Sequence, residues 1–418
     1  MTFNKTEKIK TINKKTLIAA LDIGKRVHHG YFRAPNGTDI KPFAFHNTGQ
    51  GFKTFLAKLN QFKQKHLLDE VVIGFESTGP YAEPICHYLR NKSVNLVQVN
   101  PMHTKRIKEL TGNSPNKTDR KDPRVIADVI ALGHCLSVVI PEGAAAQLRR
   151  LAHGRERAIE RKTAMSNQLQ HLVFVIFPEL VSIINPSTKT GMYLIKHFSD
   201  PACVVSMGME GLYDIIKKVS RGRFGLDRAE KLYHAAQQSV GITEGKESLL
   251  LETTQLVFNI ENENRHIEAL EKQMASFLDQ IPYSHTILSI KGIGPVTAAG
   301  LIGEVGDFRN FKTLSEVMKL AGLDLYEISS GRCQGRRRIS KRGRSLLRKL
   351  LYFAAMNTTR KNGVFYVPYQ RHLAKGMTKI KALVAIARKL IGVIFALVRD
   401  HCTFDINYST QVELRKAA

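Results

Sequence analysis

Short apolar runs alternate with longer amphipathic stretches over the first part of the chain. The runs are too short for helices and end at glycine or polar residues, so they predict buried strands. Strands are expected at residues 17–21, 30–33, 42–46, 71–75 and 94–99. Helices are expected at residues 51–65, 80–91, 101–110 and 122–132. This alternation predicts an α/β domain.

Two long helical stretches occupy the middle of the chain. In residues 142–177 apolar positions recur near heptad spacing with charged residues between them, and Pro178 ends the pattern. The apolar positions are Leu148, Leu151, Ile159, Met165, Leu169 and Leu172. Residues 247–278 form a second long helix that can pair back against the first, which predicts a coiled-coil arm. The insert between them, at about 179–245, is expected to be helical.

Glycine and basic residues interrupt the helical pattern at two places. Residues 221–225 (Arg-Gly-Arg-Phe-Gly) can contact a phosphate or simply connect two helices. Gly292-Ile293-Gly294, between two apolar segments, resembles a helix–hairpin–helix turn, which presents backbone N–H groups to a phosphate without sequence preference. Lys291 adds a positive charge there, and a plain glycine-rich helix connection is the alternative.

The chain is too long for one ordinary core, so two or three domains are expected from its 418 residues. Closing helices are expected at 346–357 and 379–400, in a mostly α-helical C-terminal region. The expected segments are a basic tail (1–15), the α/β domain (16–140), the coiled-coil helices with their insert (141–280), a C-terminal domain (281–400) and a second tail (401–418).

The net charge narrows the class of partner. Lys and Arg number 63 against 36 Asp and Glu, a formal net charge of +27, while 43% of the residues are hydrophobic. The chain can therefore bury a core, and its excess of cations indicates a polyanionic partner, DNA or RNA. A soluble enzyme that is merely basic is the alternative.

Cysteine usage and hydropathy indicate the cellular compartment of the protein. The five cysteines are scattered without a Cys-x-x-Cys pair, which favours reduced thiols and argues against a structural zinc. Residues 1–15 do not resemble a secretory signal, and the apolar stretch 382–398 is interrupted by Arg388 and Lys389. We expect a cytoplasmic, nucleoid-associated protein with no membrane segment.

The densest basic segment lies at residues 328–349, which contain no acidic residue. Its cations are Arg332, Arg336, Arg337, Arg338, Lys341, Arg342, Arg344, Arg348 and Lys349. A solvated surface normally mixes both signs of charge. This run therefore predicts contacts with a phosphate backbone and an affinity that falls steeply with salt.

Four carboxylates form a candidate metal site. Asp22 and Glu76 end two of the expected strands, and Asp119 and Asp122 lie three residues apart where a loop enters a helix. Four such groups brought together would repel one another, which makes a bound cation plausible. Oxygen ligands without Cys or His favour Mg²⁺ or Mn²⁺, which support phosphoryl transfer. Acids at strand ends are also common helix caps, and Asp122 is a good cap by itself.

The motifs together resemble the IS110/IS1111 family of insertion-sequence transposases. The N-terminal matches are residues 20–25 (Ala-Leu-Asp-Ile-Gly-Lys), 74–79 (Gly-Phe-Glu-Ser-Thr-Gly) and 117–122 (Lys-Thr-Asp-Arg-Lys-Asp). The C-terminal matches are residues 292–295, 321–323, 330–331 and 339–343. They follow the family's order and cover nearly the whole chain. No single motif is specific, but their combination is.

The resemblance implies a RuvC-like, RNase H-type DEDD domain, a coiled-coil arm and a C-terminal serine transposase domain. It implies that Asp22, Glu76, Asp119 and Asp122 are the catalytic metal ligands and that Ser330 is the nucleophile. Members of the family cut and rejoin DNA through a serine–phosphate intermediate. A structured bridge RNA from the element's noncoding end guides them, and they form homo-oligomers, dimers or tetramers, through the coiled coil.

The sequence departs from the family pattern at two places, and two alternative functions are also considered. Pro123 stands where the family usually has a small Ala. Proline is tolerated in the first turn of a helix, so the role of Asp122 is not endangered. Ser329 precedes Ser330, so the identity of the nucleophile is ambiguous from sequence alone. A RuvC-like nuclease that hydrolyses DNA with water is the first alternative function. A catalytically silent nucleic-acid-binding protein is the second, which the presence of all four acids and the serine disfavours.

Overall fold

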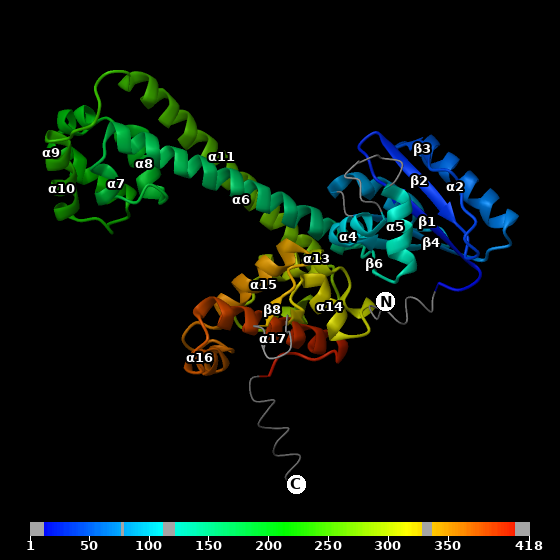
Figure 1. Ribbon diagram of the computed structural model, residues 1–418. Coiled ribbons are helices and arrows are strands. Elements are labelled where there is room, and N and C mark those ends of the chain that lie inside the picture. Colours follow the sequence, from blue (N-terminus) through cyan, green and yellow to red (C-terminus); the bar gives the residue numbers. More distant parts are fainter. Residues whose placement is uncertain (1–11, 77–78, 112–121, 328–336, 406–418) are drawn as a thin grey trace, which may run out of the picture. The chain divides into compact units, whose positions relative to one another are not determined.

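The computed structural model describes residues 12–76, 79–111, 122–327 and 337–405 (Figure 1). The chain divides into two compact units. The first, which we call the sheet unit, comprises Met1–Ile140 and Phe308–Gly343. The second, the helical unit, comprises Pro141–Asp307 and Arg344–Ala418. We describe each unit by itself.

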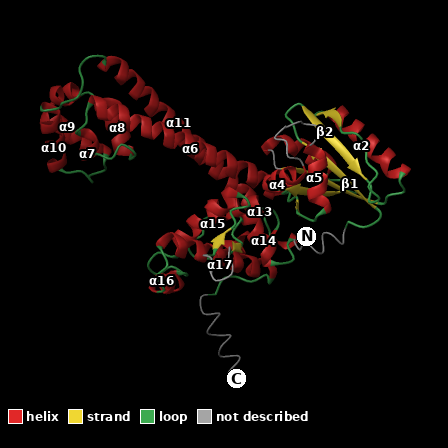
Figure 2. Cartoon of the chain, in the orientation of Figure 1, coloured by secondary structure: helices red, strands yellow, loops and turns green. Residues whose placement is uncertain are grey.

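A six-stranded mixed sheet forms the frame of the sheet unit (Figure 2). Its strands are β1 (Thr16–Asp22), β2 (Val27–Arg33), β3 (Phe43–His46), β4 (Glu70–Glu76), β5 (Asn95–Val99) and β6 (Cys135–Ser137). Their order is β3-β2-β1-β4-β5-β6, with β1, β4 and β5 parallel and the others antiparallel to their neighbours. The central strands therefore run side by side and end at the same edge.

Helices cover both faces of this sheet, which is why its central strands read as continuous apolar runs. On one face α2 (Gly49–Lys65) and α3 (Glu83–Leu89) pack on Leu21 and Phe75. On the other face α5 (Asp122–Ala131) packs on Ala20 and Val72, with α4 (Pro101–Thr111) beside it. The strands thus contribute alternate residues to two separate cores.

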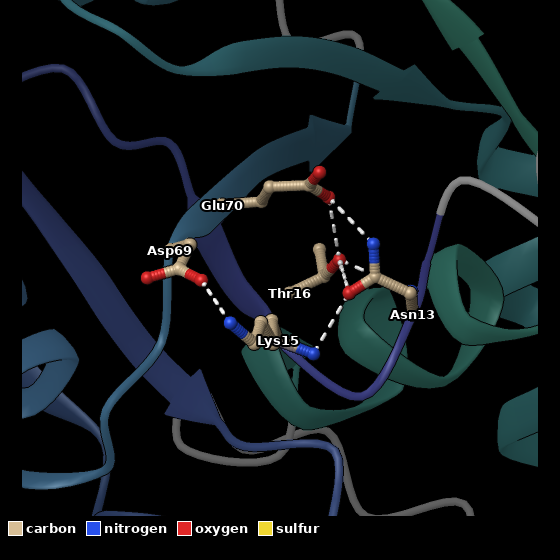
Figure 3. A network of polar contacts seen from close by, with 5 residues as sticks. All are labelled: Asn13, Lys15, Thr16, Asp69 and Glu70. Carbon is tan, nitrogen blue, oxygen red and sulfur yellow. Dashed lines mark hydrogen bonds and ion pairs between the residues drawn. The ribbon is translucent and has the colours of Figure 1, made fainter.

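A polar network joins β1 to β4 at their N-terminal ends (Figure 3). The Thr16 hydroxyl lies 2.9 Å from Glu70 Oε2 and the Asn13 amide donates to the same oxygen at 3.1 Å. Lys15 forms an ion pair with Asp69 at 2.8 Å. Thr16 and Glu70 are also register partners in the ladder. A slip by one residue would turn every side chain to the other face, so the buried apolar residues fix the register and this network is consistent with it.

The five strands and four helices expected in this domain are confirmed, with two differences. The helix expected from Pro80 begins only at Glu83, because Gly79–Ala82 forms a 3₁₀ turn first. Strand β6 was not expected. It has three residues and pairs only at the edge of the sheet, so it carries little pattern of its own.

The second segment of the sheet unit is small and irregular. It contains a 3₁₀ turn at Phe308–Asn310, α14 (Leu314–Ala321) and a two-stranded ribbon of β7 (Leu325–Tyr326) and β8 (Arg338–Ile339). A hydrogen bond from the Ser340 hydroxyl to the Asp324 carboxylate holds the chain beside this ribbon. None of these short elements was expected.

The main elements of the helical unit are two long antiparallel helices, α6 (Gly143–Ile176) and α11 (Lys246–Leu278) (Figure 1). Residue numbers rise along one helix as they fall along the other. The paired side chains are Arg155 with Glu271 at 2.7 Å, Arg161 with Glu263 at 2.8 Å, and Gln168 with Glu252 at 2.8 Å. The expected pair of long helices is confirmed, whereas coiled-coil supercoiling stays a prediction.

The insert between these helices is helical, as expected. It consists of α7 (Leu180–Ile183), α8 (Lys189–Phe198), α9 (Pro201–Val219) and α10 (Leu226–Gln237). These helices gather at one end of the α6–α11 pair (Figure 1). They share one core with the adjoining turns of α6 and α11, including Leu169, Phe177 and Val257. The insert is therefore a folded cap on the helix pair.

The remaining helices of this unit pack together at the other end of the pair (Figure 1). They are α12 (Ser284–Leu288), α13 (Pro295–Val305), α15 (Ser345–Thr358), α16 (Tyr366–Ala374) and α17 (Lys379–Arg399). The apolar face of α17 is buried, which confirms a core helix there. Within the described part of the chain, no helix is long and apolar enough to span a membrane.

Candidate active site

Asp22 and Glu76 end neighbouring parallel strands of the sheet unit. Leu21 and Phe75 are register partners, and Asp22 and Glu76 are the next residues of their two strands. Leu21 and Phe75 face α2 and α3, and successive residues of a strand point to opposite faces. Asp22 and Glu76 therefore lie on the face that α5 covers, and both are partly buried. The structure brings these two predicted residues together.

A buried threonine supports Glu76. The Thr104 hydroxyl lies 3.2 Å from Glu76 Oε2 and 2.8 Å from the carbonyl oxygen of Pro101, and its single proton can be donated to either. Only 3% of Thr104 is exposed. Sequence reasoning missed this residue, because a threonine one turn into a helix has no pattern that marks it as a partner of a distant carboxylate.

A buried histidine holds the turn that follows Asp22. The Gly24 N–H donates to His28 Nδ1 at 3.2 Å, and His28 packs between the rings of Phe45 and Phe52. Burial lowers the pKa of His28, which keeps Nδ1 available as an acceptor. Glycine is required at this turn, since a Cβ on Gly24 would lie 2.2 Å from the Val27 carbonyl oxygen.

Asn47 ties this turn to the segment after β4. Its side-chain amide donates to the carbonyl oxygen of Lys25 at 3.3 Å and to that of Tyr81 at 3.4 Å. The Asn47 side chain also partly offsets the effect of burial on the His28 pKa. The chain on either side of the two acids is therefore cross-linked by polar side chains that the sequence did not identify.

The carboxylates suit a hard divalent cation. Asp22 and Glu76 offer oxygen ligands from adjacent strand ends, which is the donor chemistry of Mg²⁺ or Mn²⁺. Asp119 lies outside the described residues, as does the side chain of Asp122, although α5 begins at Asp122 on the same face of the sheet. Among the described side chains alone, no group of three metal-ligating residues is found. Two of the four predicted ligands can thus be followed in the structure.

The predicted nucleophile lies in the segment between β7 and β8. Ser330 and its neighbour Ser329 fall outside the described residues, as do Arg332 and Arg336. The ends of that segment are nevertheless described, and the ladder joins them by pairing Tyr326 with Arg338. Strands β7 and β8 belong to the same compact unit as the two acids.

A cavity of 220 Å³ lies between the edge of the sheet and this second segment of the sheet unit. From the sheet side it is lined by His103, which precedes Thr104, and by His134, with ring centroids 5.0 Å apart. From the other side it is lined by Asp324, Ser340 and Arg342. Polar and basic side chains of both segments of the sheet unit therefore converge beside α4.

The basic run at 328–349 does not form one uniform surface. Arg337 is exposed but pairs with Glu327 at 2.8 Å, whereas Arg338, Lys341 and Arg342 are exposed cations of the sheet unit. In the helical unit Arg344 is partly buried and Lys349 pairs with Glu156. Arg344 and Lys349 thus contact residues from distant parts of the sequence, and phosphate contacts along the run stay a prediction.

We expect the exposed cations Arg338, Lys341 and Arg342 to make the salt-sensitive contacts. Changing all three to Gln should lower the salt slope of DNA binding by about two to three, since each lost phosphate contact removes about 0.7 to 0.9. Fluorescence anisotropy across a salt series measures this slope. Lys15→Gln, which removes a distant exposed lysine of the same unit, is the control. An unchanged slope in the triple variant would show that these cations face solvent.

The glycine turn at 292–294 joins α12 to α13 in the helical unit. Gly292 has φ +107°, a value that L side chains rarely adopt, and packs against Thr358. Ile293 is buried, while Lys291, Gly292 and Gly294 are exposed, and Gly294 caps α13. A turn thus joins the short helix α12 to α13, and Gly294 at the N-terminus of α13 is exposed, while the helix–hairpin–helix motif stays a prediction. Binding of phosphate there stays a prediction.

A buried ionic cluster secures α13 to α6. Glu304 is 1% exposed; His153 Nε2 lies 2.8 Å from its Oε1 and Arg149 Nε lies 3.7 Å from the same oxygen. Arg344 donates to the backbone carbonyl of Glu304. Burial alone would raise the pKa of Glu304, but the His153 hydrogen bond and the arginine charges outweigh burial and lower the pKa. Burial, together with Arg149, lowers the pKa of Arg344 to about 10.

We expect Glu304→Gln to lower the free energy of unfolding by about 2 kcal/mol, because it leaves two arginines without their buried counter-charge. The depressed pKa of Glu304 also means that its contribution is present above the unfolded pKa and is lost as the pH falls through the lower folded value. Urea denaturation at pH 7 and at acid pH tests both points. Glu263→Gln, in a more exposed pair with Arg161, should cost under about 0.5 kcal/mol. Equal effects of the two changes would contradict this account.

Comparison with known proteins comes from two family models and several curated relatives. A transposase model, that of the DEDD transposases of IS110 type, matches residues 19–178. A second model, the transposase IS116/IS110/IS902 family, matches residues 284–370. The first match covers Asp22, Glu76, Asp119 and Asp122, and the second covers the segment between β7 and β8. The mixed α/β sheet with a helical remainder fits a DEDD domain of RNase H-like fold.

Relatives match over most of their length. The chain is 25% identical to the 43.6 kDa protein of insertion element IS110 from Streptomyces coelicolor, over 94% of this chain and 96% of that protein. It is 25% identical to the 44.8 kDa protein of IS116 from Streptomyces clavuligerus, over 69% and 72%. It is 22% identical to the 42 kDa protein of IS900 from Mycobacterium paratuberculosis, over 69% and 73%.

Proposed function

This chain belongs to the IS110 family of insertion-sequence transposases, and we propose that it exchanges DNA strands through a covalent serine–phosphate intermediate. It is a transposase enzyme. We assign Ser330 as the nucleophile and the four carboxylates Asp22, Glu76, Asp119 and Asp122 as the groups that hold a divalent cation. The observation that supports the proposal is that β7 and β8, the strands before and after Ser330 in the sequence, belong to the same compact unit as the ends of β1 and β4.

The chemistry follows from this grouping. A serine hydroxyl is a weak nucleophile near neutral pH and needs activation, and no Ser-His-Asp arrangement is readable in the sequence. Bound Mg²⁺ or Mn²⁺ supplies that activation and stabilises charge on the phosphate. Asp22 and Glu76 would hold the cation at the strand ends, and Thr104 hydrogen-bonds the Glu76 carboxylate. Arg337 and Arg338, exposed arginines that follow Ser330 in the sequence, add positive charge toward the phosphate.

Strand exchange then needs no external energy source. Ser330 Oγ attacks phosphorus, an oxygen–phosphorus bond to serine forms, and the bond to the departing sugar oxygen breaks. That oxygen leaves as a hydroxyl and takes a proton. Attack of a hydroxyl from another strand reverses the step and frees the serine. The number of phosphoester bonds is unchanged throughout.

The net charge and the family together indicate which partners the protein binds. DNA of the element ends and of the target is the substrate, which would place the protein at the nucleoid in the cytoplasm. A bridge-type guide RNA selects the sequences, and the net charge of +27 accommodates two nucleic acids at once. The paired helices α6 and α11 form a coiled coil through which copies assemble. The turn at 292–294, with Lys291, Gly292 and Gly294, binds phosphate, as do Arg332, Arg336, Arg337, Arg338, Lys341 and Arg342.

A plasmid assay separates this proposal from a hydrolytic nuclease. The full chain is incubated with Mg²⁺, RNA transcribed from the element's noncoding end, and plasmids that carry the joined element ends and a target. We expect rejoined recombinant DNA that depends on both the RNA and the cation. Linear or nicked DNA without rejoined product would instead favour the nuclease. Omission of RNA and chelation of the metal are the controls.

A further inference from the structure

A groove with a volume of 920 Å³ opens on the insert that caps α6 and α11. One wall is a single face of α6, formed by Asn167, Gln170, His171 and Phe174, which are spaced by three, four and seven residues. The other wall comes from α7, the loop before α8 and the start of α10. The size of the groove lies within the range of ligand-binding clefts in proteins.

The lining combines an aromatic surface with neutral polar groups. Phe174 is 58% exposed, although it lies on a helix whose neighbouring residues are buried in the core of the insert. Asn167 and Gln170 lie beside it, and Ser182 and Asn185 come from the opposite wall. All the residues that line the groove are described, and none of them is acidic. Exposed rings flanked by amides and hydroxyls suit bases that have lost their stacking partners.

The wall at the start of α10 carries an aromatic–arginine pair. The Arg228 guanidinium lies over the Phe224 ring, 4.1 Å from its centroid. The Phe224 N–H donates to Ser220 Oγ at 3.0 Å, and the chain reverses direction through the left-handed residues Arg221 and Gly222. The basic glycine-rich motif at 221–225 is thus a fixed turn that presents a ring and a guanidinium to the groove.

Positive charge gathers at this turn. The exposed cations of residues 217–228 are Lys217, Lys218, Arg221, Arg223 and Arg228. The one acid of that stretch, Asp227, pairs with Lys231 at 2.9 Å. Arg228 lines the groove, and the other four cations lie within seven residues of Phe224, which also lines it, so a phosphate backbone can be held beside bases that enter the groove.

We propose that this groove binds unpaired nucleotides of a single-stranded nucleic acid, with bases against Phe174 and phosphates along the 217–228 turn. A duplex keeps its bases stacked and cannot use the exposed ring. RNA and DNA share the chemistry that the groove recognises. The inference does not depend on the carboxylates or on Ser330, so strand exchange and binding in this groove can fail independently.

Photocrosslinking tests the assignment directly. The full chain is mixed with a 16-nucleotide single-stranded RNA that carries 5-iodouridine, or with the matching DNA, in excess unlabelled duplex DNA. We expect crosslinked peptides that contain Phe174 or Phe224. Phe174→Ala should weaken single-strand binding about tenfold. The double change Arg223→Gln and Arg228→Gln should lower the salt slope by about one to two.

Matched controls come from the partner helix. Phe258→Ala and Arg265→Gln remove an exposed ring and an exposed cation of α11 and should leave binding unchanged. Stronger crosslinking of RNA than of DNA would identify RNA as the ligand, whereas equal crosslinking would identify any single strand; both outcomes support the proposal. Crosslinks that map only elsewhere, with unchanged affinity in the groove variants, would overturn it. A change of oligomeric state in Phe174→Ala with unchanged binding would also overturn it, by making the groove a protein interface.

Discussion

Replacing Asp22 by Asn is expected to lower the rate of strand exchange by roughly 10³-fold. Asn has the size of Asp and fits the end of β1, but it lacks the negative charge that opposes a divalent cation. Asp22 is partly buried beside the end of β4, where water compensates a lost charge poorly. Joined product measured over time at several Mg²⁺ concentrations gives the rate. Glu76→Gln should behave in the same way.

Asp69→Asn is the matched control for this prediction. Asp69 is an exposed acid just before β4, at the opposite end of the strand from Glu76, and pairs with Lys15. Loss of this carboxylate should change the rate of strand exchange by less than about twofold relative to the wild type, because an exposed ion pair contributes little to stability. Circular dichroism checks that all variants are folded. A wild-type rate for Asp22→Asn at saturating Mg²⁺ would remove Asp22 from the metal site.

Replacing Ser330 by Ala is expected to abolish both the covalent adduct and the joined product. The change removes the one oxygen that the mechanism makes a nucleophile, so no slower version of the same step is left. Binding to DNA and RNA should stay unchanged. Adduct yield on a denaturing gel and affinity by anisotropy measure the two effects.

Ser329→Ala is the control that resolves the ambiguity between the two serines. It removes a hydroxyl from the adjacent residue of the same segment, and we expect it to keep most of the activity. Loss of the adduct in Ser329→Ala together with its retention in Ser330→Ala would move the nucleophile by one residue without changing the rest of the mechanism.

Most of the fold could be predicted because its long elements carry their own pattern. Strands β1 and β4 are buried on both faces and read as continuous apolar runs. Helices α6 and α11 have 34 and 33 residues, so their helical pattern could be predicted although the heptad spacing is imperfect. Strands β6, β7 and β8 escaped prediction because two or three residues hold no period, and their pairing is decided by partners distant in sequence.

The candidate site was predictable only in part. Acids at the ends of apolar runs pointed to Asp22 and Glu76, since parallel strands end at one edge of a sheet. Thr104, His28 and Asn47 could not be found, because their roles depend on tertiary contacts with residues up to 34 positions away. The contacts of two residues in the basic run could not be predicted for a similar reason: Arg344 contacts Glu304 and Lys349 contacts Glu156, 40 and 193 positions away.

Covalent trapping on DNA tests the central claim most directly. The full chain, Mg²⁺, the element's noncoding RNA and labelled end-junction DNA are combined, denatured and separated on a gel. We predict a labelled protein–DNA adduct in the wild type and in Ser329→Ala that is lost in Ser330→Ala and in Asp22→Asn. Cleaved DNA that carries no protein, formed equally by the wild type and by Ser330→Ala, would contradict the serine mechanism and identify a hydrolytic nuclease.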